Sequence, residues 1–151
     1  QAAFLAPEAF GRHPGRVSAM IDAGQLMEAE TFARKLLQDD DTDGAVWAAL
    51  GDVLGASDRP SEAVEAYLQA GSTEARVRAI RAREAAEGAD AAQLLIRKLE
   101  LGGASHPRIG LESARLYLDA GDAPACLREL RIRGLDGEKI ARSLMKRCER
   151  R

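Results

Sequence analysis

Carboxylates are plentiful in this sequence, but we expect them on solvated helix faces opposite Lys or Arg, and few other residues could do acid–base or nucleophilic chemistry. Its two histidines, His13 and His106, each directly precede a proline, which indicates loop positions. Nucleophilic catalysis needs a serine or cysteine within reach of an oriented base, and neither histidine has such a partner nearby in the sequence. The GxSxG and phosphate-loop motifs are also absent. We therefore expect a protein that is not an enzyme and needs no cofactor.

The sequence also offers little that could hold a metal ion. Cys126 and Cys148 fall on apolar stripes of predicted helices, so two small buried side chains are the first expectation. A disulfide stays open, because two cysteines alone do not reveal one. There is no CxxC or HxxxH spacing. The acidic run 39–43 lacks the ligand pattern of a calcium loop, and we expect it to be a solvated loop that caps the next helix.

Composition indicates an all-α domain. The chain has 151 residues, of which 46% are hydrophobic and only 4% aromatic, and it favours strong helix formers over sheet formers. This length fits a single domain over residues 1–151. The formal net charge of −2 disfavours nucleic acid as a partner. No apolar run approaches the roughly 18 residues that a transmembrane helix needs.

The sequence does not establish where the protein works. Its first residues lack an initiator Met and the basic region of a signal peptide. We expect a fragment of a longer repeat protein. A cytoplasmic location is slightly favoured, and a periplasmic one stays open if a signal was removed.

An internal period gives the strongest evidence on architecture. The pair Glu28-Ala29 recurs as Glu62-Ala63, 34 residues later. Residues spaced three or four apart share one face of a helix. Two groups of residues next to these pairs have this three- or four-residue spacing. The first-helix group is Trp47, Leu50, Gly51 and Leu54, and the second-helix group is Ala63, Tyr67 and Ala70. Gly51 and Ala63 are small enough to allow a close helix crossing.

These residues resemble the tetratricopeptide-repeat (TPR) family, whose first helix reads W-x2-L-G-x2-Y. Here the final Tyr is Leu54, and Ala75 replaces the closing Pro. The resemblance covers about residues 10–135 and is most specific over 24–71. It implies a right-handed superhelical stack of about four antiparallel helix pairs and a C-terminal capping helix. The predicted pairs are 14–38, 44–71, 73–101 and 107–133, and the capping helix is 137–149.

The predicted capping helix has one apolar and one basic face. Its basic residues are Lys139, Arg142, Lys146, Arg147, Arg150 and Arg151. A terminal helix of a repeat array needs a polar outer face, so we expect these residues to be solvated. An acidic partner or a membrane surface is the alternative.

The resemblance also implies a binding groove, because first helices line the concave face of such arrays. Residues on these helices that point away from the core are the expected groove residues. They are Ser18, Asp22, Ala48, Asp52, Arg78, Arg108, Arg115 and Asp119. We expect the arginines to contact carboxylates of a peptide, since their planar fork pairs with them bidentately, and Asp22 and Asp52 to contact basic groups.

The resulting expectation is a non-catalytic scaffold that binds a peptide segment or a partner protein. Bacterial proteins that resemble it often serve secretion, polysaccharide export or cofactor-assembly complexes. Two alternatives stay open. An RNA-binding helical repeat would need a positively charged groove, whereas a self-assembling repeat segment would form a homo-oligomer through its terminal helix face.

Overall fold

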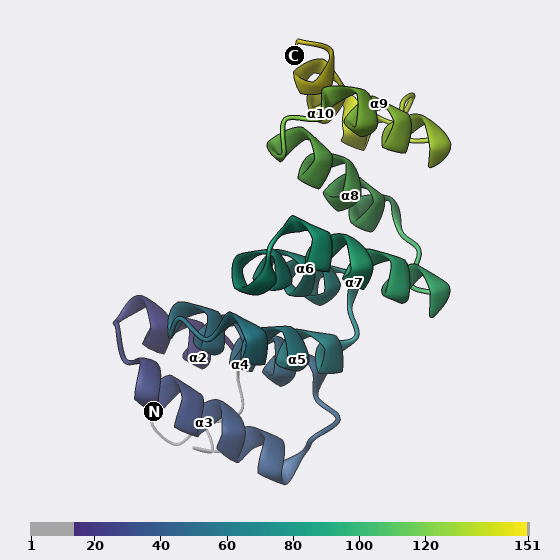
Figure 1. The fold of residues 1–151 in the computed structure, drawn as a ribbon. Helices are drawn as coiled ribbons and strands as arrows, with labels where there is room; N and C mark the ends of the chain where they lie inside the picture. Colours follow the sequence, from purple (N-terminus) through teal and green to yellow (C-terminus); the bar gives the residue numbers. More distant parts are fainter. Residues whose placement is uncertain (1–13, 151) are drawn as a thin grey trace. The chain divides into compact units, whose positions relative to one another are not determined.

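The computed structural model describes residues 14–150, and these residues form helices and connecting turns with no strand. The all-α expectation is therefore confirmed for the described part of the chain (Figure 1). The elements are α2 (Pro14–Asp22), α3 (Leu26–Asp39), α4 (Gly44–Ala56), α5 (Pro60–Ala70), α6 (Thr73–Glu87), α7 (Ala89–Leu101), α8 (Pro107–Asp119), α9 (Ala123–Ile132), the 3-10 helix η2 (Lys139–Ala141) and α10 (Arg142–Glu149). His13 and Arg151 lie outside the described residues.

The chain divides into two compact units. Unit 1 ends at Ala75 and contains α2 to α5, whereas unit 2 begins at Arg76, within the first turn of α6, and continues to the C-terminus. The expectation of one continuous domain stays a prediction, and each unit is described by itself below.

The helices lie close to the ranges expected from the sequence, with one exception near the C-terminus. The helix expected over 137–149 is instead two elements, η2 and α10. Its expected beginning, Gly137-Glu138, is outside both elements. Glycine favours such an early break because it loses the most backbone freedom in a helix.

Side-chain caps define several helix starts. The Asp43 carboxylate accepts hydrogen bonds from the backbone N–H groups of Ala45 and Val46, so the acidic run caps α4 as expected. Ser72 caps α6 in the same way. No side chain caps α7, which follows Gly88 and begins at Ala89, and Asp90 lies inside its first turn.

Unit 1 is built around the contact between α4 and α5. A Cβ atom added at Gly51 would lie only 2.5 Å from Cε1 of Tyr67, so the glycine makes room for the aromatic ring. The Tyr67 hydroxyl donates a hydrogen bond to Asp52 Oδ1 at 2.5 Å. At the start of α4, a Cβ at Gly44 would meet the backbone carbonyl oxygen of Ala70, at the end of α5, at 2.7 Å. The two helices therefore run antiparallel and in close contact.

Unit 2 has a buried cluster that joins α8, α9 and α10. Among its members are Leu118 of α8, Leu130 of α9 and Ala141 just before α10. Cys126 and Cys148 are also buried there and form a disulfide between α9 and α10, with Cα atoms 6.2 Å apart. Both cysteine side chains are thus buried, as expected, and the disulfide that the sequence left open is present.

Some large apolar residues are exposed although they lie on helices that pack into the core. Met27, Leu94 and Leu101 have exposed fractions of 82%, 63% and 91%, and Ile140 is also exposed. Leu94 and Leu101 are seven residues apart and so share a helix face, while Leu95 and Ile96 of the same helix are buried. The apolar run of α7 is wider than the stripe that its neighbours cover.

None of the helices within residues 14–150 combines the length and apolar character needed to cross a bilayer.

Replacing Gly51 with alanine should destabilise unit 1, although alanine is the better helix former by about 1 kcal/mol. The new methyl group would overlap the Tyr67 ring, and overpacking of this kind costs about 1–3 kcal/mol. Chemical denaturation of the full chain measures the change in the free energy of unfolding. Gly55→Ala is the matched control in the same helix, since a Cβ there meets nothing within 4 Å. Equal stability of the two variants would contradict the Gly51–Tyr67 contact.

Removing the disulfide should loosen the C-terminal end of unit 2. The bond closes a loop between residues 22 positions apart, and loss of such a cross-link costs about 3 kcal/mol in the chain-entropy model. The double variant Cys126→Ala/Cys148→Ala should therefore show a lower midpoint of denaturation and faster amide exchange in α10. Unchanged amide exchange in α10 would show that packing alone holds this helix.

Candidate functional site

The first-helix residues expected to form a groove are divided equally between the two units. In unit 1, Ser18 and Asp22 are exposed on α2, four residues apart. Ala48 and Asp52 lie on α4 and are partly buried. Asp52 already accepts the hydrogen bond from Tyr67. The joining of all eight residues in one binding surface stays a prediction.

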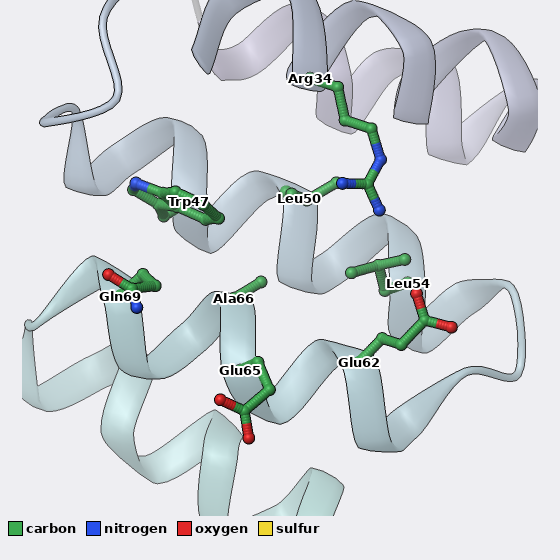
Figure 2. Close-up of a pocket in the computed structure, with 8 residues that line it drawn as sticks. All are labelled: Arg34, Trp47, Leu50, Leu54, Glu62, Glu65, Ala66 and Gln69. Atoms are coloured by element: carbon green, nitrogen blue, oxygen red, sulfur yellow. The ribbon is translucent and has the colours of Figure 1, made fainter. Parts of the chain in front are cut away.

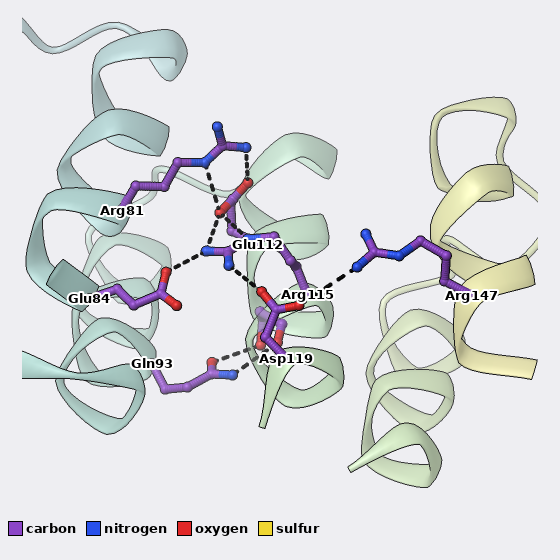
Figure 3. A network of polar contacts seen from close by, with 8 residues as sticks. Arg81, Glu84, Gln93, Glu112, Arg115, Asp119 and Arg147 are labelled. Atoms are coloured by element: carbon purple, nitrogen blue, oxygen red, sulfur yellow. Dashed lines mark hydrogen bonds and ion pairs between the residues drawn. The ribbon is translucent and has the colours of Figure 1, made fainter. Parts of the chain in front are cut away.

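In unit 2, two of the expected groove residues belong to a dense network of charged groups, shown in Figure 3. Arg115 contacts Glu84 of α6 and both Glu112 and Asp119 of its own helix, at 2.7, 2.9 and 2.7 Å. Glu112 is only 5% exposed and also binds Arg81 at 2.8 Å. Burial opposes the charge on Arg115, but the hydrogen bonds from its carboxylate partners raise its pKa above the ordinary value. Arg115 therefore links α6 to α8.

The remaining expected residues of unit 2 are Arg78 of α6 and Arg108 of α8, both partly buried. Arg108 lies in the first turn of α8, where its backbone N–H donates to His106 Nδ1 at 3.1 Å. His106 thus acts as a helix cap, which agrees with its expected loop position.

The structure reveals an open groove in unit 1 that the sequence did not predict. Its volume is about 310 Å³, and residues of three helices line it. Figure 2 shows α4 between the other two helices, with Arg34 extending from α3 on one side. The lining residues are Arg34 of α3, Trp47, Leu50 and Leu54 of α4, and Glu62, Glu65, Ala66 and Gln69 of α5. Below, this surface is called the α4 groove.

The floor of the α4 groove is apolar and its rim is charged. Leu50, Leu54 and Ala66 are buried, whereas Trp47 is partly exposed and offers part of its ring to the groove. The Trp47 indole N–H donates to the backbone oxygen of Asp41 at 2.7 Å. This bond holds the ring against the acidic loop at one end of the groove.

Two arginines and two glutamates connect α3 to the start of α5 beside this rim, and Arg34 and Glu62 are the two of them that line the groove. Arg59, the residue before α5, binds Glu30 at 2.7 Å and Glu62 at 2.5 Å, and Arg34 binds Glu30 at 3.0 Å. The hydrogen bond from Arg59 lowers the pKa of Glu62 below the usual carboxyl value. Burial alone would raise the pKa of Glu30, yet its two arginine partners lower the pKa overall. Both carboxylates therefore remain ionised at neutral pH.

None of the eight expected groove residues lines the α4 groove. The TPR resemblance predicts a groove on the outward face of each first helix, whereas the α4 groove lies between two second helices, α3 and α5. A signal was nevertheless present in the sequence. Glu62, Glu65 and Gln69 have the three- and four-residue spacing of one helix face, and this polar stripe adjoins the buried Ala63 and Ala66.

A second cavity of about 230 Å³ lies in unit 2, where α7, the start of α8 and the segment after α9 meet. Its charged residues are Glu100 and Arg133, and the two terminal guanidinium nitrogens of Arg133 donate to the Glu100 carboxylate. Arg133 also binds Glu129 at 3.0 Å. Hydrogen bonds with these carboxylates outweigh burial and raise the pKa of Arg133. Glu100 and Arg133 thus neutralise each other within this cavity.

Within residues 14–150, no group of three or more His, Cys, Asp or Glu side chains is arranged to hold a metal ion. No protein-family model matches the chain, and no curated protein matches it either.

Replacing Arg115 with alanine should destabilise unit 2. The change leaves the buried Glu112 with one fewer partner and removes the ion pair between Glu84 and α8. Loss of a charged partner of this kind lowers the free energy of unfolding by about 2 kcal/mol. Arg128→Ala on the exposed side of α9 is the control, with an expected change within about 0.5 kcal/mol. Thermal denaturation of both variants measures the difference. Equal melting temperatures would show that the network is ordinary solvated charge.

Proposed function

We propose that this chain is a non-catalytic protein-interaction module that binds a peptide segment or a partner protein as part of a larger assembly. In this proposal its helix pairs stack in a right-handed superhelix, as in tetratricopeptide repeats. The close antiparallel contact between α4 and α5 supports this view, because Gly51 and Tyr67 occupy positions of the TPR pattern and lie against each other there.

The observation that carries the proposal is the α4 groove. It combines an apolar floor, a partly exposed tryptophan and a charged rim. Tryptophan is enriched among the residues that dominate binding energy at protein interfaces, especially where a polar rim surrounds an apolar centre. A volume of about 310 Å³ is enough for one or two side chains of a bound segment.

The residue types of the groove favour binding over catalysis. A general acid at neutral pH needs a raised pKa, whereas the contact with Arg59 lowers the pKa of Glu62. The groove contains no serine, cysteine or histidine among its lining residues. His106, the histidine within residues 14–150, belongs to unit 2 and caps α8.

The outward faces of α2 and α4 remain a second proposed contact surface. Ser18 and Asp22 are exposed there and are available to a partner that also fills the α4 groove. Asp52 contributes less, because its carboxylate holds the Tyr67 hydroxyl.

Selection of peptides from a random-sequence display library on the full chain tests this function. Binders should be recovered, and calorimetry should show that Trp47→Ala weakens them about 30-fold, the loss typical of an anchoring interface residue. Circular dichroism checks that the variant keeps its helices.

The control for this experiment is Leu94→Ala, which removes an exposed apolar side chain from unit 2. It should leave the affinity of the selected peptides unchanged. Failure to recover any binder, or equal affinity for wild type and Trp47→Ala, would contradict the proposed use of the groove.

A further inference from the structure

We propose that the α4 groove selects a basic segment of another polypeptide, with an aliphatic or aromatic side chain flanked by lysine or arginine. This inference rests on the proposed function and adds the chemical class of the partner. It depends on the balance of charge around the groove, which is considered from its centre outward.

The rim ion pairs contribute no net charge. Arg34 and Arg59 offset Glu30 and Glu62 one for one, and all four groups are joined at 2.5 to 3.0 Å. A ligand charge that paired with one of these groups would share it with an existing partner of opposite charge. The rim ion pairs therefore do not determine whether the groove prefers a positively or a negatively charged ligand.

Glu65 supplies the surplus charge. It lies on α5, lines the groove and is exposed. In Figure 2 it lies on the α5 side of the groove, between Glu62 and Gln69. A carboxylate beside an apolar floor attracts a cation whose aliphatic stem can cover that floor, as lysine and arginine stems do.

The end of the groove near Trp47 is also negative. The indole N–H binds the backbone oxygen of Asp41, so the acidic segment of Asp39, which ends α3, and Asp40 and Asp41, which follow it, is anchored at this end. The side chains of these three residues are exposed. Asp40 also accepts hydrogen bonds from Thr42, and this contact orders the loop.

A basic side chain on either side of an apolar anchor would thus meet negative charge. The anchor would pack on Trp47, Leu50 and Leu54, one basic group would approach Glu65 and the other the acidic segment 39–41. Cations are also attracted to the face of a tryptophan ring. An acidic segment would meet the same groups with repulsion, and complementarity of this kind sets specificity more than affinity.

The test uses Trp47, the only tryptophan in the sequence, as the reporter. Three pools of synthetic peptides share a central Phe or Leu, with flanks of Lys and Arg, of Asp and Glu, or of Ser and Gln. Titration of the full chain with the basic pool should shift Trp47 emission at the lowest concentration. Added salt should weaken this binding, because it screens exposed charges.

Two variants with the same change in net charge locate the effect. Glu65→Lys should weaken the basic pool about fivefold or more, the effect of replacing an attraction by a repulsion at an exposed site. Glu28→Lys is the control, because Glu28 is exposed on α3 and does not line the groove. An equal loss of affinity in both variants would overturn the assignment to Glu65.

The outcomes separate this inference from the proposed function. Preference for the acidic or the neutral pool, with a shift of Trp47 emission, would overturn the basic partner and leave peptide binding intact. Absence of any shift with all three pools would remove the groove as a peptide site, and the proposed function would fail with it.

Discussion

The contact between Gly51 and Tyr67 fixes the rest of unit 1. The absence of a side chain at Gly51 lets the aromatic ring lie directly on α4, and the hydroxyl of that ring reaches Asp52 in the next position. This pair sets how closely α4 and α5 approach. The approach in turn places Leu50 and Leu54 beside the polar stripe of α5, and the α4 groove results from that placement.

Much of this architecture could be predicted from the sequence because its signals are local. Proline at the start of α5, Asp43 before α4 and Gly71 after α5, with its positive φ of 75°, each act within one turn of a helix end. The spacing of Trp47, Leu50, Gly51 and Leu54 predicted one packed face, and the last three of these residues are buried. Helix ends and this face depend on neighbours in the chain, which a sequence displays directly.

The remaining features depend on contacts between distant segments. The sequence shows Leu94 and Leu101 as apolar positions of one helix, but only the structure shows that both are exposed. The disulfide required Cys126 and Cys148 to meet across two helices. Arg59 likewise binds Glu30, 29 positions earlier. The groove was missed for the same reason, since its walls belong to two second helices that become neighbours only after folding.

Nuclear magnetic resonance of the full chain tests the central contact most directly. The Hα protons of Gly51 should show nuclear Overhauser effects to the Tyr67 ring and an upfield ring-current shift, because the ring lies against this glycine. A folded, assigned spectrum in which the Gly51 protons have ordinary helical shifts and no cross-peak to Tyr67 would contradict the packing of α4 on α5, and with it the groove.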